Sequence, residues 1–255
     1  MKWDKKSIKL RRDFIPPMRQ QLVFVEDAID ERTPMQPLDP VVFDRYMEQG
    51  WRLLGYTIIR HNFAVCRSQM CGTIPLRIRL KDFRFSKSQR QLLRRNAELS
   101  VEYGPIKLTP EHDALFQVHS EQRFTERRPE LLATFIGAKA HIEPVTGTSF
   151  TVRMPDGQIG AYSFMHIGRQ AVSGTYCFFH PDYSKFSLGT YTLLLELQKS
   201  LELNMEYYYP GYCYDVPSQF DYKLNFNALE AYNWKTGAWE PRERLPVRQW
   251  ESLLD

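Results

Sequence analysis

The chain has 255 residues, 43% hydrophobic and 14% aromatic, which is enough to bury a core in one large domain or two closely merged small ones. Charged residues make up an ordinary 25%, so the disordered, collagen-like and fibrous classes are excluded. The net charge of +4 is too small for a protein that coats nucleic acid. Basic residues instead gather at residues 2–12 and 87–95, which indicates local patches.

The cysteine content and the N-terminus bear on the compartment. The chain has four scattered cysteines, too few for a disulfide scaffold: Cys66, Cys71, Cys177 and Cys213. The basic segment at residues 1–13 has no apolar run behind it, unlike a signal peptide. No stretch approaches the ~20 apolar residues that a membrane span requires. We therefore expect a reduced, cytoplasmic protein that has no membrane partner.

The elements predicted up to residue 105 begin with an irregular arm. The prolines of residues 1–38 predict this arm, with one short strand at residues 22–25. Asp39-Pro40 predicts a helix start, with the carboxylate as N-cap, and the helix is expected to end at about residues 50–55. Residues 74–80 alternate apolar and polar, which predicts a half-buried strand with Pro75 at its beginning or at a sheet edge. Ser86 is expected to cap a basic helix.

The second part of the chain changes from helix to strand. Thr109-Pro110 predicts a helix to about Arg128, and residues 149–154, 159–167 and 172–179 predict three strands. Ser187 then caps a predicted helix, which a strand at residues 206–209 follows. This order resembles the GNAT (acetyltransferase-like) core. We therefore predict an α+β fold with an arm over 1–38, an N-terminal transferase module over 39–105 and a GNAT-like transferase domain over 106–255.

Three segments carry a family resemblance, in order along the chain. The first reads GWRLLG at residues 50–55, followed by IRLKDFRFSKSQR at 78–90. The second reads FFHPDYSKFSLGTY at residues 178–191, and the third reads YYYPGY at 207–212 with FDYK at 220–223. Together they resemble the arginyl- and leucyl-tRNA–protein transferases over about residues 43–235.

The resemblance implies an enzyme of the N-end rule. Such an enzyme moves an amino acid, arginine first and leucine second, from aminoacyl-tRNA to the N-terminal amine of an acceptor protein. The acceptor would begin with an acidic, oxidised or basic residue, and the product would be marked for degradation.

The chain also departs from the family pattern. Only Cys66 and Cys71 stand where family members have a cysteine cluster, and two thiolates cannot furnish a four-ligand site. Pro210 replaces the leucine that is expected before Gly211, and residues 216–219 differ as well. We therefore predict a divergent member that has no metal and no cofactor.

The candidate site residues follow from the resemblance and from local pattern. The catalytic candidates are Ser187, Tyr209 and Gly211; Ser187 opens a helix whose free N–H groups can polarise an oxygen. The substrate-binding candidates are Tyr212, Tyr222 and Lys223, and Lys223 is expected to meet the acidic first residue of the acceptor or a tRNA phosphate, if it is not simply a surface lysine. The tRNA-binding candidates lie on the basic helix: Lys87, Gln89, Arg90, Arg94 and Arg95. Asp215 is a further candidate base, although no motif supports it.

The reaction that the resemblance implies needs few catalytic groups. The aminoacyl ester is already activated, and a protein α-amine has a pKa of ~8. Alignment, a modest base and donors to the developing oxyanion therefore suffice.

Two alternatives stay open. One is a GNAT-fold small-molecule N-acyltransferase, which the absence of a glycine-rich coenzyme A loop at residues 185–189 disfavours. The other is a catalytically inactive tRNA-binding protein, which Pro210 and the missing cysteines suggest.

Overall fold

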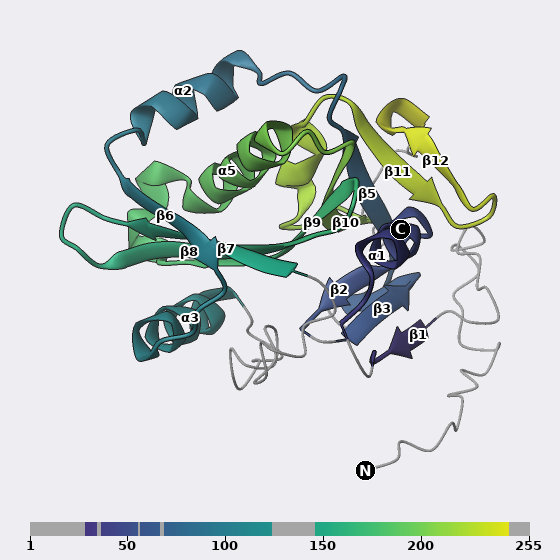
Figure 1. Cartoon of the computed structure of the whole chain (residues 1–255), viewed down its shortest axis with the longest axis horizontal. Helices are drawn as coiled ribbons and strands as arrows, with labels where there is room; N and C mark the ends of the chain where they lie inside the picture. Colours follow the sequence, from purple (N-terminus) through teal and green to yellow (C-terminus); the bar gives the residue numbers. More distant parts are fainter. Residues whose placement is uncertain (1–28, 35–36, 56, 67–68, 124–145, 245–255) are drawn as a thin grey trace, which may run out of the picture.

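The computed structural model of the chain describes residues 29–34, 37–55, 57–66, 69–123 and 146–244 (Figure 1). The basic segment at residues 2–12, the strand predicted at 22–25 and the helix end predicted near Arg128 lie outside these residues. The α+β class is confirmed, because helices pack on a mixed nine-stranded sheet and a three-stranded sheet stands beside it. No helix among the described residues has both the length and the apolarity needed to cross a bilayer.

The first described elements form the small sheet and the helix beside it. Strands β1 (Ile29–Arg32), β3 (Thr57–His61) and β2 (Arg52–Leu54) are antiparallel neighbours in that order. Helix α1 (Pro40–Glu48) begins as predicted, with the Val41 N–H donating to Asp39 Oδ1 at 2.8 Å. Gly50 follows the helix at φ +80°, a conformation that favours glycine, and turns the chain into β2. This turn places Arg52 beside the large sheet.

The large sheet runs in the order β12-β11-β5-β10-β9-β8-β7-β6, and β4 pairs with β5 off this path. Its strands are β4 (Phe63–Cys66), β5 (Gln69–Arg79), β6 (Ser100–Pro105), β7 (Thr146–Arg153), β8 (Ile159–Ile167), β9 (Ala171–Phe179), β10 (Tyr207–Tyr214), β11 (Leu229–Asn233) and β12 (Ala238–Pro241). Only the β9–β10 pair is parallel among its ladders, because helix α5 (Leu188–Glu202) carries the chain from one to the other.

Helices cover both faces of this sheet. Helices α5 and α2 (Lys87–Arg95) lie on one face, and α3 (Pro110–Arg123) lies on the other (Figure 1). The main core lies under α5, where Leu194 and Leu197 are fully buried with Val172 and Tyr208. Three short 3₁₀ helices, η3 (Pro181–Phe186), η4 (Asp221–Asn225) and η5 (Arg242–Arg244), complete the described elements. The site described below therefore rests on a well-packed layer.

The position of Pro75 differs from the prediction. It lies within the central strand β5, opposite Tyr212 of β10, and not at a strand start or sheet edge. Thr73 and Arg79 lie an even number of residues from Pro75, so their N–H groups point to the same edge of β5 as the Pro75 nitrogen. They donate to the carbonyls of Asn62 and Ala228, on the edge of β5 away from β10. The nitrogen of Pro75 thus faces the interval between the ends of β4 and β11, where no ladder partner is paired with it. A central proline is tolerated here because no N–H is required.

Candidate functional site

Strands β9 and β10 begin as a parallel pair and then separate. The ladder holds only from Ala171 opposite Tyr207 to Ser173 opposite Tyr209. The pairing of β10 with β5 shifts register between Tyr208 and Gly211, so β10 carries a bulge there. Pro210 lies in this bulge and has no N–H to donate to a neighbouring strand. The residue that departs from the family pattern is therefore the point where the two strands part.

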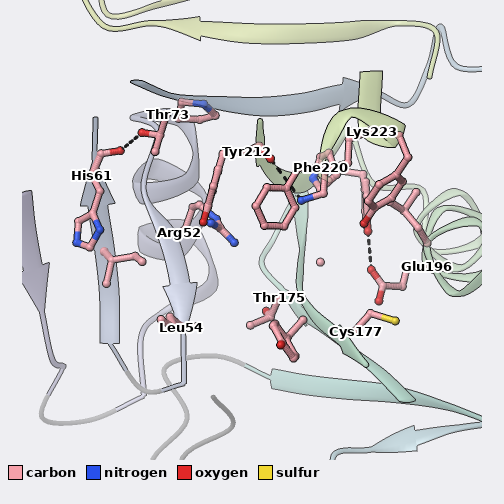
Figure 2. Close-up of a pocket in the computed structure, with 18 of the residues that line it drawn as sticks. Arg52, Leu54, His61, Thr73, Thr175, Cys177, Glu196, Tyr212, Phe220 and Lys223 are labelled. Carbon is pink, nitrogen blue, oxygen red and sulfur yellow. Dashed lines mark hydrogen bonds between the residues drawn. The ribbon is translucent and has the colours of Figure 1, made fainter. Parts of the chain in front are cut away.

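A cavity of about 300 Å³ lies where the strands separate (Figure 2). Its walls come from β9, β10, α5 and the segment around η4, together with β2, β3 and β4 of the first part of the chain. Figure 2 shows Arg52 and Tyr212 on one side of the cavity and Thr175 and Cys177 on the other. Concave cavities with a few polar groups are the usual form of a ligand site.

One wall carries a buried carboxyl group. Glu196 of α5 is 4% exposed, and the hydroxyl of Tyr208 donates to its Oε2 at 2.5 Å. Burial raises the pKa of Glu196 to about 7, while the Tyr208 hydrogen bond acts in the opposite direction. Gly174 of β9 passes so close that a Cβ on it would collide with the Tyr208 hydroxyl and lie 2.6 Å from Glu196 Oε2. Glu196 is thus held firmly and titrates near neutrality.

The cavity also carries two cations. Arg52 of β2 lies with its Cζ 4.2 Å from the ring centroid of Tyr212, and Lys223 of η4 donates from Nζ to the Tyr212 carbonyl at 3.4 Å. Burial, followed by the positive charge of Arg52, lowers the pKa of Lys223 to about 7. Burial also lowers the pKa of Arg52. The two side chains come from distant parts of the chain, and their positive charges repel one another because both groups are buried.

Gly211 allows the two cations to converge. Its φ of +97° lies in the region that favours glycine. A Cβ there would lie 3.1 Å from Arg52 Nη2 and 3.2 Å from Lys223 Nζ, which is tighter than ordinary packing. The absence of a side chain at Gly211 therefore leaves room for both nitrogen atoms. Gly211, predicted as catalytic, lies beside the cavity in the structure.

The three predicted substrate-binding residues, Tyr212, Tyr222 and Lys223, all line the cavity. Tyr209, predicted as catalytic, instead packs with Phe43 and Trp51 in the core under α1. The side chain of Asp215 accepts from the Gly72 N–H at 2.8 Å.

Ser187 lies away from the cavity, at the start of α5. Its φ of 50° is left-handed, and its side chain makes no capping hydrogen bond, which differs from the predicted serine cap. Arg95 Nη2 donates to Ser187 Oγ at 3.3 Å, so this serine joins α2 to the start of α5.

The predicted tRNA-binding residues share helix α2. Lys87, Arg90, Arg94 and Arg95 are exposed, as expected for a surface that meets phosphates. Gln89 is buried, and its side chain accepts from the Ser86 N–H at 2.8 Å while Ser86 Oγ accepts from the Gln89 N–H. This reciprocal pair is a capping box, which gives Gln89 a structural task that the prediction did not include.

Arg52 and Glu196 are absent from the residues predicted from sequence. Arg52 lies within the GWRLLG segment, but no local feature distinguishes it from a surface arginine. Glu196 had a signal, since it is a carboxylate inside the apolar run TLLLELQ at residues 192–198. A charge on the buried face of a helix indicates a partner or a function.

The cysteines and histidines of the described residues make no evident metal site. No group of three or more His, Cys, Asp or Glu residues lies close enough to hold an ion within the part of the chain that the structure describes. Cys71 is disulfide-bonded, which differs from the expected reduced state, whereas Cys177 and Cys213 are not in a disulfide.

A family model matches the part of the chain that supplies the β9, β10, α5 and η4 walls of the cavity. A family model described as "Arginine-tRNA-protein transferase, C terminus" matches residues 111–233. An aspartate/glutamate leucyltransferase of Nitrosococcus oceani is 29% identical over 206 residues, covering 78% of this chain and 82% of that protein. The protein of the same name from Campylobacter jejuni is 27% identical over 191 residues, covering 72% and 77%.

Solved structures give more distant likenesses. L-PGS from Bacillus licheniformis has a TM-score of 0.43 at 11% identity, covering 72% of this chain and 54% of that one. FemX has a TM-score of 0.44 at 7% identity, covering 70% and 61%.

Proposed function

The chain belongs to the aminoacyl-tRNA–protein transferases, and from this premise we propose that the cavity between β9 and β10 is where the aminoacyl ester meets the acceptor amine. The enzyme transfers an amino acid from aminoacyl-tRNA to the N-terminus of a protein. The observation that carries the location is the cavity itself, in which a carboxyl group of shifted pKa faces two buried cations. Such groups gather at sites of chemistry more often than elsewhere.

We propose leucine as the amino acid and Asp or Glu as the first residue of the acceptor. The names of the relatives support both choices. The cavity supports leucine over arginine, because Leu54, Ile59 and Phe63 give it an apolar lining and because Arg52 and Lys223 would repel a guanidinium. The resemblance alone favours the reverse order, arginine before leucine. Marking of the product for degradation stays a prediction.

We propose that Glu196 is the general base. Its carboxylate would take a proton from the α-ammonium group of the acceptor, and the neutral amine would attack the ester carbonyl carbon. A tetrahedral intermediate forms, and its nitrogen releases a second proton to water. Collapse of the intermediate breaks the bond to the ribose oxygen, which receives the proton held by Glu196, so the products are an amide, a free ribose hydroxyl and one proton in solution. A base whose pKa lies near the working pH is well matched to this exchange. Tyr208 orients the carboxylate through its hydrogen bond.

We propose a GNAT-like core for the second part of the chain, with a domain boundary near residue 105. The order β7, β8, β9, α5, β10 supports it, since this is the hairpin, strand, helix, strand order expected from sequence. The exposed cations of α2 are the proposed contacts for tRNA phosphates, and Arg95 connects that helix to the start of α5. A small-molecule N-acyltransferase finds no support in the relatives.

A transfer assay tests the proposed function. Leucyl-tRNA and arginyl-tRNA, each carrying a labelled amino acid, are incubated with the enzyme and with peptides that begin with Asp, Glu or Ala. We expect labelled leucine on the Asp and Glu peptides and little on the Ala peptide. Transfer of arginine in preference to leucine would overturn the donor assignment, and no transfer from either tRNA would favour the inactive tRNA-binding alternative.

A further inference from the structure

We infer that Arg52 and Lys223 together form the subsite that holds the side-chain carboxylate of the acceptor's first residue, with Arg52 as a specificity-determining residue. The inference rests on the proposed function and adds to it the residues that choose the acceptor. Arg52 lies outside residues 111–233, the range that the family model matches.

The first argument for this subsite is that Arg52 and Lys223 have no described carboxylate at ion-pair distance. Within the residues that the structure describes, neither Arg52 nor Lys223 forms an ion pair with a carboxylate. Other arginines there do: Arg77 lies 2.6 Å from Glu230, and Arg153 pairs with Glu102 and Glu111. A buried charge normally has a partner, because desolvation without one is costly. Lys223 senses the charge of Glu196, but neither cation has a described carboxylate at ion-pair distance, and two such adjacent cations indicate an anion supplied by a ligand.

The second step is convergence on the cavity. Arg52 lies against one side of Tyr212, and Lys223 Nζ lies 4.8 Å from the ring centroid of Phe220 while it contacts the Tyr212 carbonyl. Figure 2 shows the nitrogen ends of both side chains turned toward the interior of the cavity. Gly211 leaves the space between them open. The aromatic rings and the carbonyl hold the cations in place but leave N–H groups of both for a carboxylate.

The third step is the fit to one occupant. The N-terminal residue of an acidic acceptor carries an α-ammonium group and a side-chain carboxylate, whose carbon lies three bonds from the nitrogen in Asp and four in Glu. The cavity offers the complementary pair, with Glu196 on one wall and Arg52 with Lys223 on another. Binding the carboxylate to the cations would direct the amine toward Glu196. The charges of this wall therefore select the acceptor and orient it for attack.

A tRNA phosphate fits the same nitrogen atoms less well. The aminoacylated 3′ end carries no terminal phosphate, so each phosphate near the aminoacyl ester is flanked by a nucleoside on both sides. Lys223 is only 8% exposed. A carboxylate at the end of a short side chain reaches such a depth more readily than an internal phosphodiester.

The experiment compares Arg52→Met, Lys223→Met and Arg52→Lys with the control Lys235→Met, which removes an exposed lysine outside the cavity. The acceptors are peptides that differ only in the first residue, as the pairs Asp/Asn and Glu/Gln. Each variant is assayed for kcat/KM and for its Kd for leucyl-tRNA, and a thermal melt verifies folding.

We expect Arg52→Met and Lys223→Met to lower kcat/KM for Asp and Glu peptides by roughly ten- to a hundredfold, the usual effect of losing one charged hydrogen-bonded contact. The Asn and Gln peptides should change little, so the preference for the acid collapses. The Kd for tRNA should not change, Arg52→Lys should recover part of the preference, and Lys235→Met should match the wild type.

Two results would overturn the inference. Equal losses on acidic and neutral peptides together with a weaker Kd for tRNA would assign the cations to phosphate. A wild-type enzyme that transfers leucine to Asp and Asn peptides equally well would exclude a carboxylate subsite even if no variant folds. If the wild type transfers nothing to any peptide, the proposed function has failed, and this result is distinct from both.

Discussion

The two groups of positive charge in this molecule, on helix α2 and in the cavity, differ in almost every physical respect. The cations of α2 are exposed and close together in sequence, at Lys87, Arg90 and Arg94. The cations of the cavity, Arg52 and Lys223, come from distant segments, and burial lowers the pKa of each. Exposed charges interact weakly and are screened by salt, whereas desolvated charges are costly to bury and interact strongly with a ligand.

The comparison indicates a division of labour. A surface of screened charges suits a long polyanion such as tRNA, which needs many weak contacts. A desolvated pair suits a single small anion that must be distinguished from a neutral isostere. The expected effects of substitution should therefore be large in the cavity and small on α2.

The largest effect is expected at the carboxyl group that faces the cavity cations. Glu196→Gln keeps the shape and the possible hydrogen bond from Tyr208 but removes the base, so kcat should fall by roughly a hundred- to ten-thousandfold. Single-turnover transfer with saturating leucyl-tRNA measures this, with tRNA affinity as the control. If kcat falls no further than it does when the cations of α2 are replaced, Glu196 is not the general base and the expected difference between cavity and α2 is absent.

The next largest effect is a gain in the free energy of unfolding, where the previous prediction is a loss of activity. The pKa of Lys223 is about 7 in the folded state and ~10.4 when unfolded, so the unfolded chain binds more protons between these values. The wild type should therefore gain stability as the pH rises from 7 to 10. Lys223→Met should be more stable than the wild type by about 2–4 kcal/mol at pH 7 and should lack this rise.

Urea denaturation at pH 7 and pH 9 measures both quantities, and Lys235→Met serves as the exposed control. If Lys223→Met is less stable than the wild type and its stability depends on pH in the same way, burial of the Lys223 ammonium group does not destabilise the folded protein.

The pH profile with an acidic acceptor should be bell-shaped about neutrality. Activity rises with pH as Glu196 and the acceptor amine lose protons, and it falls by up to about tenfold per unit as Lys223 loses its charge above about 7. The groups acting on Lys223 are Arg52 of β2, Cys213 of β10 and Glu196 of α5. The alkaline fall should be absent with an Asn peptide and in Lys223→Met; its persistence in both would assign it to another group.

The smallest effect is expected on α2. Replacing Lys87, Arg90 and Arg94 together with Ala should reduce the slope of log K for tRNA against log salt by up to about three units and leave the Asp/Asn preference intact. Filter binding at several salt concentrations measures the slope. An unchanged slope would show that α2 does not contact tRNA. The contrast between exposed cations that bind tRNA and buried cations that bind the acceptor would then fail.

Local patterns predicted much of the fold. The helix start at Asp39-Pro40, the helix cap at Ser86 and the strand at Ile159–Ile167 were all predicted, because caps, turns and alternation act over a few residues. The sequence did not predict that β10 continues beyond Tyr209 or that Pro75 lies within a central strand, because both depend on which strands become neighbours. Sheet order is a long-range property.

The candidate site divides in the same way. Tyr212, Tyr222 and Lys223 were found through a motif and do line the cavity. Arg52 was missed because its role comes from Tyr212 and Gly211, which are far from it in sequence. Tyr209 was named from the same strand, but alternation along β10 turns it toward the opposite face.

The measurement that tests the account most directly is the alkylation rate of Cys177. This β9 thiol, which is not in a disulfide, lines the cavity, whereas Cys213 is buried, so Cys177→Ser supplies the background rate. Iodoacetamide labelling is followed by mass spectrometry in the presence of a peptide that begins with Asp or with Asn. The account predicts that the Asp peptide slows alkylation of Cys177 and that the Asn peptide does so much less. Equal rates with either peptide and with none, at concentrations that support transfer, would show that the acceptor binds elsewhere.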